Sequence, residues 1–383
     1  MAFIQQSFSV AFEYKVFFTE HLFASTNRDF AQFLESRAEK GFRKKLLFIV
    51  DEGVTATHGY LQEQITAYCS DMEGFELVED VIVVPGGEAA KNDLQLFHWL
   101  VNAVDQHAID RHSYIIAIGG GSVLDLVGYV AAVSHRGVKH IRIPTTVLSQ
   151  NDSGVGVKNG INYHGKKNFL GTFAPPAAVF NDAHFLTTLD ERDWRSGMVE
   201  AVKVALIKDA AFFSWMEEKA AQLTEAEPES LKYLIHRCAE LHMQHIGGAG
   251  DPFESGSSRP LDFGHWSAHK LEQLTDFELR HGEAVSIGIA LDSVYSWLTG
   301  LLDAESLERI IQLLKTLRLP LYHPLLEIED DEAPIVAGLQ EFREHLGGRL
   351  TISLLEAIGK GKEVHSIDIS TLRKAVNMLR DKW

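Results

Sequence analysis

The sequence has little of what marks several large classes of protein. Two cysteines, Cys69 and Cys238, are too few for a disulfide framework and indicate a reducing compartment. No run reaches the ~18 apolar residues of a membrane span, and the N-terminal residues show no basic start followed by an unbroken apolar stretch. Basic residues are outnumbered, because 36 Lys and Arg against 53 Asp and Glu give a net charge of -17, which repels a phosphate backbone. We therefore expect a cytoplasmic protein that binds neither a membrane nor a nucleic acid.

The remaining composition is that of an ordinary globular protein. With 45% hydrophobic and 23% charged residues and only 10 prolines, the chain can bury a sizeable core, and disorder is excluded for most of its length. At roughly 150 residues per domain, the length predicts two domains. An anionic substrate would need a local pocket of Lys, Arg and helix N-termini within this acidic chain.

Short apolar runs alternate with longer helical stretches from about Lys44 to Phe180. The runs KKLLFIV, VIVVP, YIIAIGGG, HIRIPTT and AAVFND predict successive strands of a parallel sheet with crossover helices. After Pro175 and Pro176, long amphipathic stretches predict a mainly helical half, in which RLTISLLEAIG either returns to the sheet or forms a small strand pair. We expect a Rossmann-like α/β domain over residues 1–178 and a mainly α-helical domain over 179–383.

Glycines stand where one of these strands gives way to a helix. Side-chain-free backbone there can approach a pyrophosphate, although Leu124 stands where the usual fingerprint has its third glycine. The segment PGGEAAK, with Glu88 and Lys91, is a second glycine-containing turn after a predicted strand. Asp51 ends an earlier strand, as a ribose-binding carboxylate often does. The alternative is a set of tight turns without a ligand, but three such strand ends in one sheet favour a cofactor. The glycine-rich turn consists of Gly119, Gly120, Gly121 and Ser122.

The helical half contains a carboxylate and three histidines that suit a zinc ion with one open position. They are Glu200, His265, His269 and His281. His265 and His269 are four residues apart and share a helix face, which leaves open whether both bind metal. A single histidine is more often structural, but the HGE segment can place His281 at a helix start, close to the others. The spacing therefore predicts a metal site.

A Gly-, Asn- and Lys-rich connection with little periodicity joins the two halves, from about Ser134 to Pro176. We expect a long loop, and such loops in compact domains are usually functional or disordered. It carries the cationic and amide groups that a phosphate would need: Arg136, Lys158, Lys166, Lys167 and Asn168. The alternative is a solvated basic loop.

Taken in order, the motifs from about Asp51 to Gly359 resemble 3-dehydroquinate synthase and the wider sugar phosphate cyclases. The matching segments include PGGEAAK, GGGSVLDLVGYVAA, PTTVLSQNDSGVGVKNGIN, GKKNFLG, SGMVEAVKVALI and HGEAVSIGIA. The resemblance implies an NAD-binding α/β domain packed on a helical domain, with NAD and Zn2+ (or Co2+) in the cleft between them. The implied reaction is redox-neutral: transient oxidation by NAD, elimination of phosphate, return of the hydride, ring opening and intramolecular aldol closure to a carbocycle.

The resemblance also implies a role for each matching residue. Glu200, His265 and His281 would bind the metal, with His269 as the catalytic histidine on the phosphate side. Asp152 and Lys203 would bind substrate hydroxyls, and Lys158 and Asn168 the phosphate end. Arg136 matches an arginine that the family's dimers lend across the subunit interface, so a homodimer is expected. The NAD-side positions are Asp51, Glu88, Lys91, Gly120, Gly121, Ser122, Asp125, Thr145, Thr146, Lys167, Phe185, Thr188 and Leu189.

Several substrate positions depart from the synthase pattern. Counting from His265, a carboxylate-binding arginine falls on Ser258, and a second substrate-binding lysine falls on Gln244. The family's asparagine before Phe-Gly-His is Asp262, and a late Asp-Lys-Lys element has become something like Glu341, Phe342 and Arg343. Charge-assisted hydrogen bonds are worth roughly 1.5 to 3 kcal/mol each, so their loss should weaken binding of a 2-keto acid. A sugar phosphate without a carboxylate, such as sedoheptulose 7-phosphate, is the alternative substrate.

Two rival functions remain. Metal-dependent polyol dehydrogenases share the two-domain plan and the GGGS turn, but they usually place an Asp where this chain has Glu200. A non-catalytic protein that keeps the fold is disfavoured by the intact set of metal-ligand types and by Lys203.

Overall fold

The computed structural model describes residues 2–383 except 79–80, 249–252, 254–259, 331 and 346–347. The chain forms two compact units. The sheet unit comprises the chain up to Pro144 together with residues 157–182, and the helical unit comprises residues 145–156 and 183–383. The predicted boundary after residue 178 lies close to the passage from one unit to the other at Asp182. The assignment of two domains stays a prediction, and residues 145–156 group with the helical half.

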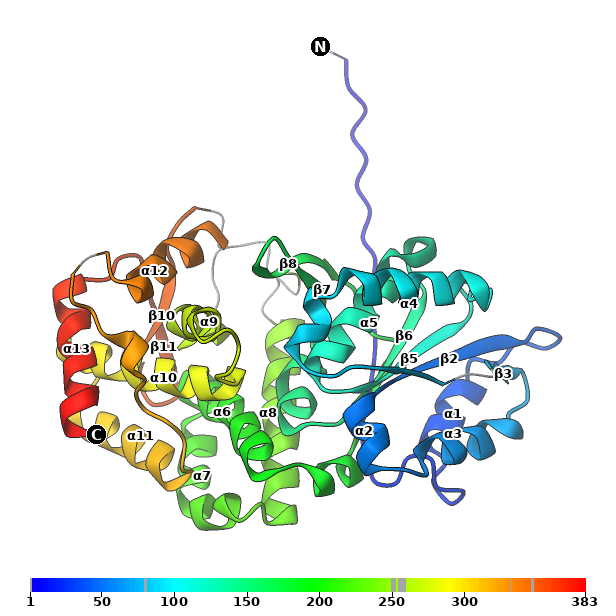
Figure 1. Ribbon diagram of the computed structural model, residues 1–383, viewed down its shortest axis with the longest axis horizontal. Coiled ribbons are helices and arrows are strands. Elements are labelled where there is room, and N and C mark those ends of the chain that lie inside the picture. Colours follow the sequence, from blue (N-terminus) through cyan, green and yellow to red (C-terminus); the bar gives the residue numbers. More distant parts are fainter. Residues whose placement is uncertain (1, 79–80, 249–252, 254–259, 331, 346–347) are drawn as a thin grey trace. The chain divides into compact units, whose positions relative to one another are not determined.

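The sheet unit is built on parallel strands in the order β1-β9-β6-β5-β2-β3, with β4 also paired to β2 (Figure 1). The strands are β1 (Val16–Thr19), β2 (Lys44–Asp51), β3 (Phe75–Leu77), β4 (Ile82–Val84), β5 (Tyr114–Gly119), β6 (Lys139–Pro144) and β9 (Ala178–Asp182). The helices are α1 (Asp29–Glu35), α2 (Glu52–Thr57), α3 (Leu61–Ser70), α4 (Leu94–Gln106) and α5 (Gly121–Val133). All five predicted strands are confirmed, whereas β1 and β3 were not predicted.

Central strand β5 explains why the apolar runs could be recognised as strands from the sequence. All six of its residues are buried, and its register pairs Leu46–Val50 of β2 with Tyr114–Ile118. A parallel strand covered on both faces requires apolar side chains in both directions, so it appears as a continuous hydrophobic run. The carboxyl ends of β2, β4 and β5 therefore meet at one edge of the sheet.

The helical unit contains α6 (Glu191–Lys208), α7 (Ala210–Thr224), α8 (Pro228–Gly248), α9 (His265–Leu274), α10 (His281–Leu298), α11 (Ala304–Thr316), α12 (Pro334–His345) and α13 (Ile369–Lys382). Its core centres on α6 and α10, whose residues are almost all buried from Ser196 to Ile207 and from Ala284 to Ser296. The late apolar run forms β10 (Ile352–Ala357), which pairs with β11 (Lys360–Val364) in a separate two-stranded sheet. This settles the choice left open by the sequence in favour of the strand pair. The predicted fold class is confirmed.

The prediction of a long loop between the two halves was wrong over much of that segment. It contains a short π-helical turn (Ser149–Ser153) and a hairpin of β7 (Lys158–Tyr163) and β8 (Lys166–Phe173). The strands approach closely, because a Cβ built on Gly160 would lie 2.9 Å from the Leu170 carbonyl oxygen. Gly160, which weakens the strand pattern in the sequence, is therefore required by the hairpin itself.

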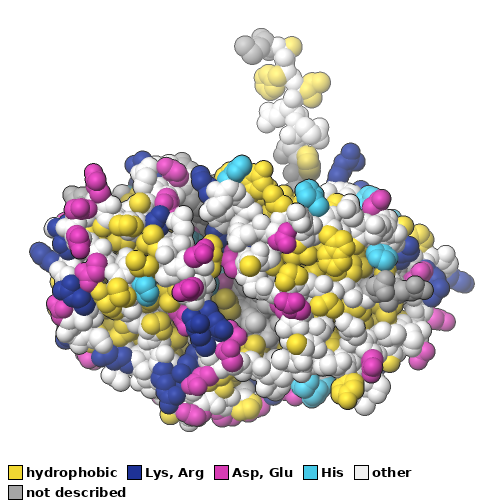
Figure 2. Space-filling model, viewed as in Figure 1, with side chains coloured by type: hydrophobic (Ala, Val, Ile, Leu, Met, Phe, Trp, Pro, Cys, Tyr) yellow, Lys and Arg dark blue, Asp and Glu magenta, His cyan; other side chains and the backbone are white. Residues whose placement is uncertain are grey.

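The surface carries charges of both signs. Acidic and basic side chains are interspersed over the face drawn in Figure 2. Among the described residues, no helix is both long and apolar enough to cross a membrane.

Candidate functional site

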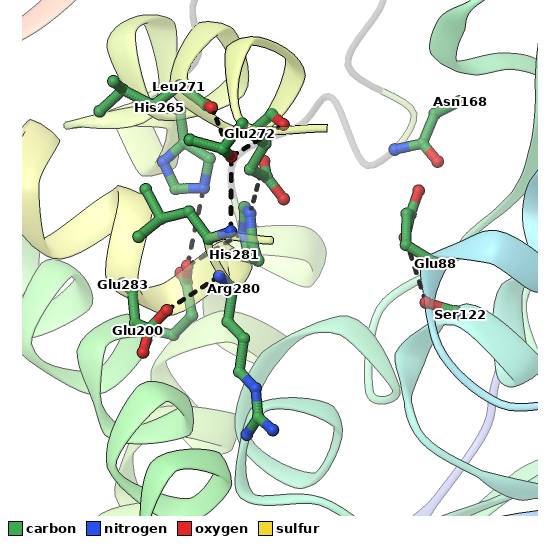
Figure 3. A network of polar contacts seen from close by, with 12 residues as sticks. Glu88, Ser122, Asn168, Glu200, His265, Leu271, Glu272, Arg280, His281 and Glu283 are labelled. Atoms are coloured by element: carbon green, nitrogen blue, oxygen red, sulfur yellow. Dashed lines mark hydrogen bonds and ion pairs between the residues drawn. The ribbon is translucent and has the colours of Figure 1, made fainter. Parts of the chain in front are cut away.

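Three predicted metal ligands meet in the helical unit. Glu200 lies within α6, and His265 and His281 are the first residues of α9 and α10. The Nε2 atoms of His265 and His281 lie 3.6 Å and 3.5 Å from Oε1 of Glu200. Figure 3 shows both rings directed toward this carboxylate. One donor atom from each residue lies within 4.8 Å of the others, a spacing that can hold one metal ion.

Hydrogen bonds to the other ring nitrogens set the direction of both imidazoles. Nδ1 of His265 donates to the Phe263 carbonyl oxygen at 3.0 Å, and Nδ1 of His281 donates to Oε2 of Glu272 at 3.1 Å. A proton on Nδ1 leaves the lone pair on Nε2, which is the arrangement of a metal-bound histidine. Burial and Lys203 hold the pKa of His265 below its usual range, so this ring is neutral near pH 7.

Glu200 is fully buried; its Oε2 is ion-paired with Nζ of Lys203, whereas its Oε1 has no hydrogen-bond partner among the described residues. Burial would raise the pKa of Glu200, but an ion pair with Lys203 and the two histidines lower it well below the usual range. A buried carboxylate oxygen without a hydrogen bond is costly, and Oε1 faces two histidine Nε2 atoms that can share a cation with it. One carboxylate and two Nε2 atoms are also the ligand set of a catalytic zinc site with open positions. The residues present therefore fit a divalent metal.

A second grouping overlaps the first. Donor atoms of His269, Glu272 and His281 also lie within 4.8 Å of one another. Glu272 already accepts a hydrogen bond from His281, whereas Oε1 of Glu200 has no hydrogen-bond partner among the described residues and faces both histidines, so the first group is the better candidate. Sequence reasoning missed Glu272. Its spacing of seven residues from His265 on one helix, which returns to the same face after two turns, could have identified it.

Two glycines fix the start of α9. Gly264 precedes His265 with a φ of +76°, a left-handed conformation that favours glycine. Gly288 of α10 lies against it, because a Cβ there would be 1.9 Å from the Gly264 carbonyl oxygen. Asp292 completes the support by accepting from the Gly264 amide at 3.1 Å and from Nε1 of Trp266 at 2.9 Å. These contacts hold the first turn of α9, and with it His265, against α10.

Asp152 lies in the π-helical turn, which also belongs to the helical unit. Nδ2 of Asn151 donates to the Gly197 carbonyl oxygen at 2.9 Å and ties this turn to α6. Oδ1 of Asp152 accepts from Nδ1 of His242 on α8 at 2.8 Å. Burial would raise the pKa of Asp152, but Lys203 and His242 lower it, so the carboxylate is ionised. His242 was not predicted.

In the sheet unit, three neighbouring strand ends come together around Asp51. A Cβ built on Gly86 would lie 2.6 Å from both carboxylate oxygens of Asp51, and one on Gly119 would lie 3.1 Å from its Cβ. Oδ1 of Asp51 accepts from the Gly53 amide at 2.9 Å, and burial raises its pKa. The glycines after β4 and within β5 are therefore needed for the approach of this carboxylate.

A polar network links several of the other predicted NAD-side residues of this unit. Oγ of Ser122 donates to Glu88 at 3.1 Å, and Nδ2 of Asn162 donates to the same carboxylate at 2.9 Å. Nζ of Lys91 pairs with Asp125 at 2.8 Å and also contacts the Asn168 side chain. Glu88 and Ser122 point toward one another in Figure 3. The network gathers side chains from the PGGEAAK segment, from α5 and from the hairpin.

The hairpin does not bring the two predicted phosphate ligands together. Lys158 pairs with Phe173 at its open end, and Asn168 lies near the turn, roughly five residues or about 16 Å along the strands. Asn168 contacts Lys91 of the NAD-side network instead.

The remaining predicted residues are scattered over both units. Thr145 and Thr146 follow β6, Gly120 and Gly121 start α5, and Lys167 lies in β8. Phe185 and Thr188 lie in a 3-10 segment that Leu189 follows. Arg136 is exposed in a turn with a φ of +64°. Gln244 is exposed on α8, Asp262 ends a 3-10 turn, Glu341, Phe342 and Arg343 lie in α12, and Ser258 lies outside the described residues.

Comparison with known proteins gives consistent matches. The family model for the N-terminal part of 3-dehydroquinate synthase matches residues 81–196, and that for the C-terminal part matches residues 197–335. The 3-dehydroquinate synthase of Thermodesulfovibrio yellowstonii is 33% identical over 87% of this chain and 90% of its own length. That of Nitratiruptor sp. is 40% identical over 66% of this chain and 70% of its own length.

A solved structure is similar over almost the whole chain. The 2-epi-5-epi-valiolone synthase ValA from Streptomyces hygroscopicus subsp. jinggangensis, with NAD+ and Zn2+ bound, is 30% identical with a TM-score of 0.87. The match covers 99% of this chain and 100% of ValA. The chain belongs to the 3-dehydroquinate synthase family.

Proposed function

We propose that this protein is an NAD- and divalent-metal-dependent sugar phosphate cyclase that eliminates phosphate and closes a carbocycle. The observation that carries the proposal is the buried carboxylate of Glu200, whose Oε1 has no hydrogen-bond partner among the described residues and faces Nε2 of two histidines. The family relationship and the NAD+ and Zn2+ bound to ValA support the same cofactors here.

When bound, the metal would supply a Lewis acid for a substrate hydroxyl, and NAD would supply a reversible hydride acceptor. Glu200, His265 and His281 would hold the metal. Asp152, ionised beside Lys203, can accept hydrogen bonds from substrate hydroxyls, and the Lys203 ammonium can donate to them.

Binding of NAD is assigned to the strand ends of the sheet unit. Asp51 is a carboxylate acceptor suited to ribose hydroxyls, and the N-terminus of α5 at Gly120 and Gly121 offers backbone amides to the pyrophosphate. Glu88, Lys91, Ser122 and Asp125 form the network beside this turn. The other NAD-side positions keep this role as part of the proposal: Thr145, Thr146, Lys167, Phe185, Thr188 and Leu189.

The substrate is a small sugar phosphate, with two candidates. The first is the heptulosonate phosphate that 3-dehydroquinate synthases convert. The second is a sugar phosphate without a carboxylate, such as sedoheptulose 7-phosphate, and the exposed, neutral Gln244 at a position expected to carry a lysine favours it. In both cases His269 would act near the phosphate, with Lys158 as a phosphate ligand, whereas Asn168, which was also expected there, contacts Lys91 of the NAD-side network. We also propose a cytoplasmic homodimer, with Arg136 exposed for an intersubunit contact.

The test is a phosphate-release assay on purified protein with NAD and zinc, run with each of the two sugar phosphates. Phosphate release without net change in NADH absorbance is expected from one of them, and Glu200→Gln should abolish it. Net NADH formation with glycerol would favour a polyol dehydrogenase instead. Absence of both activities in protein that binds zinc and NAD would overturn the proposal.

A further inference from the structure

Arg142 is a buried cation of the sheet unit that the proposed function does not use. It lies in β6, and its exposed fraction is 0%. Burial lowers the pKa of Arg142, while the charge of Asp125 raises it, and an arginine side chain stays protonated at neutral pH. A buried charge is costly unless the groups around it satisfy its hydrogen bonds. The partners of this guanidinium therefore have to stay in place.

Two of these partners belong to the start of the hairpin formed by β7 and β8. Nη2 of Arg142 donates to the Lys158 carbonyl oxygen at 2.9 Å and to Oδ1 of Asn159 at 2.6 Å. Nδ2 of Asn159 in turn donates at 3.1 Å to the carbonyl oxygen of Ala174, the residue that follows β8. Asn159 is itself buried. Arg142 is thus connected to the residue that opens the hairpin and, through Asn159, to the residue that follows it.

The hairpin needs such a connection because it is not a continuation of the large sheet. Among the described residues, β7 and β8 pair only with each other and form a separate two-stranded sheet. A two-stranded hairpin is marginally stable by itself. Since β6 belongs to the large sheet, the hydrogen bonds of Arg142 link the base of the hairpin to that sheet.

Gly128 on α5 leaves the space that this arrangement requires. Helix α5 lies against β7 (Figure 1). A Cβ built on Gly128 would be 1.8 Å from Oδ1 of Asn159 and 2.9 Å from Cε1 of His140. A side chain at this position would therefore displace the oxygen to which Arg142 donates. We call Arg142, Asn159 and Gly128 the hairpin anchor.

Lys158 is the residue through which the hairpin anchor can affect the reaction. Its side chain is exposed, whereas its carbonyl oxygen is held by Arg142. A lysine side chain loses much rotamer freedom when it is ordered against a ligand. A fixed main chain limits what remains to be ordered when the Lys158 ammonium meets a phosphate.

We propose that Arg142 is a positioning residue for phosphate binding: through the hairpin anchor it holds the main chain of Lys158 against β6. The inference rests on the proposed function, in which Lys158 is a phosphate ligand. Arg142 itself is buried and acts on the phosphate only through the hairpin.

The binding test uses inorganic phosphate as the probe, titrated calorimetrically into protein loaded with zinc and NAD. Arg142→Met should raise the Kd by about 3- to 10-fold, the factor that corresponds to ordering one long side chain. In the double variant Arg142→Met/Lys158→Met, the Kd should equal that of Lys158→Met alone, because effects that act through one group do not add. An unchanged Kd in Arg142→Met, or two factors that multiply in the double variant, would overturn the inference.

A second measurement does not depend on phosphate. In hydrogen-deuterium exchange, the amides of residues 158–173 should exchange about 10- to 100-fold faster in Arg142→Met, as expected for losing a hydrogen bond to a charged group. The amides of β5 should keep their wild-type rates. Arg142→Lys, which retains a charged donor, should give an intermediate rate.

Gly128→Ala tests the same anchor with Arg142 intact, and it keeps the test decisive if Arg142→Met does not fold. It should accelerate exchange in residues 158–173 and raise the Kd for phosphate as Arg142→Met does. Gly247→Ala on α8, where a Cβ meets nothing within 4 Å, is the matched control. Wild-type exchange of the hairpin in Gly128→Ala, or faster exchange throughout the sheet unit, would overturn the inference. Absence of phosphate release from wild-type protein on both sugar phosphates counts against the proposed function instead, and the exchange rates then decide whether the anchor exists.

Discussion

Glu272 accepts a hydrogen bond from Nδ1 of His281 at 3.1 Å, while Nε2 of the same ring lies 3.5 Å from Glu200. Glu272 is almost fully buried on α9, and His281 begins α10. The carboxylate therefore connects two helices and orients the Nε2 atom that we propose as a metal ligand. His265 obtains the same orientation from a main-chain carbonyl oxygen, which no side-chain substitution removes.

Replacing Glu272 should weaken metal binding without altering the ligands themselves. Outer carboxylate partners of metal-bound histidines typically change metal affinity by about 10- to 100-fold when mutated. We expect affinity to fall in the order wild type, Glu272→Gln, Glu272→Leu, because glutamine still accepts a hydrogen bond and leucine does not. Zinc competition with a chelator measures this, with exposed Glu308→Gln on α11 as control. Equal affinity in Glu272→Leu and wild type would contradict the role.

The two overlapping ligand groups make different predictions for two histidines. If the ion lies in the Glu200 group, the zinc affinity of His265→Ala should fall by at least about 100-fold. His269→Ala should keep about one zinc per chain. Metal analysis after dialysis, together with competition titration, distinguishes them. The reverse pattern would place the ion in the group of His269, Glu272 and His281.

Elements that are buried on both sides were the easiest to predict. The run Tyr114–Gly119 is apolar throughout because every residue of β5 is buried, and its end coincides with the glycine turn. The hairpin of β7 and β8 was missed because close backbone approach at Gly160 and Gly171 demands glycine, which weakens a strand pattern. Sequence periodicity reports side-chain burial, so it fails where backbone contacts decide the structure.

The site was predictable only in part. Glu200, His265 and His281 could be selected by residue type and by motif, but their convergence depends on the packing of α6, α9 and α10. Glu272 and His242 meet their hydrogen-bond partners, His281 and Asp152, only in the fold, His242 across 90 residues. No local pattern distinguishes such side chains from ordinary polar residues on a helix surface.

Replacing Gly86 by a residue with a side chain should weaken NAD binding. A Cβ there would lie 2.6 Å from both oxygens of Asp51, so Gly86→Ala must displace that carboxylate. We expect the Kd for NAD to rise about 10- to 100-fold, the loss of one hydrogen bond to a charged group, and to match Asp51→Ala. Calorimetric titration measures the Kd. Gly59→Ala, where a Cβ meets nothing within 4 Å, is the control, and wild-type NAD affinity in Gly86→Ala would contradict the assignment of Asp51.

Asp292 should make the metal-free protein less stable as the pH rises. Burial raises its pKa from 3.8 to about 7, although Trp266 and the Gly264 amide donate to it. A carboxyl group with a raised pKa in the folded state contributes stability that is fully present below about pH 4 and is lost as the pH rises through about 7. Relative to Asp292→Asn, which does not titrate, the wild type should therefore lose at most about 4 kcal/mol of unfolding free energy between pH 4 and pH 8. Urea unfolding at several pH values measures the difference, and Glu308→Gln, which removes one exposed carboxylate, should not reproduce it. A difference between Asp292→Asn and the wild type that stays constant with pH would show that Asp292 keeps its charge over the whole range, and that its support of the turn before His265 is ionic.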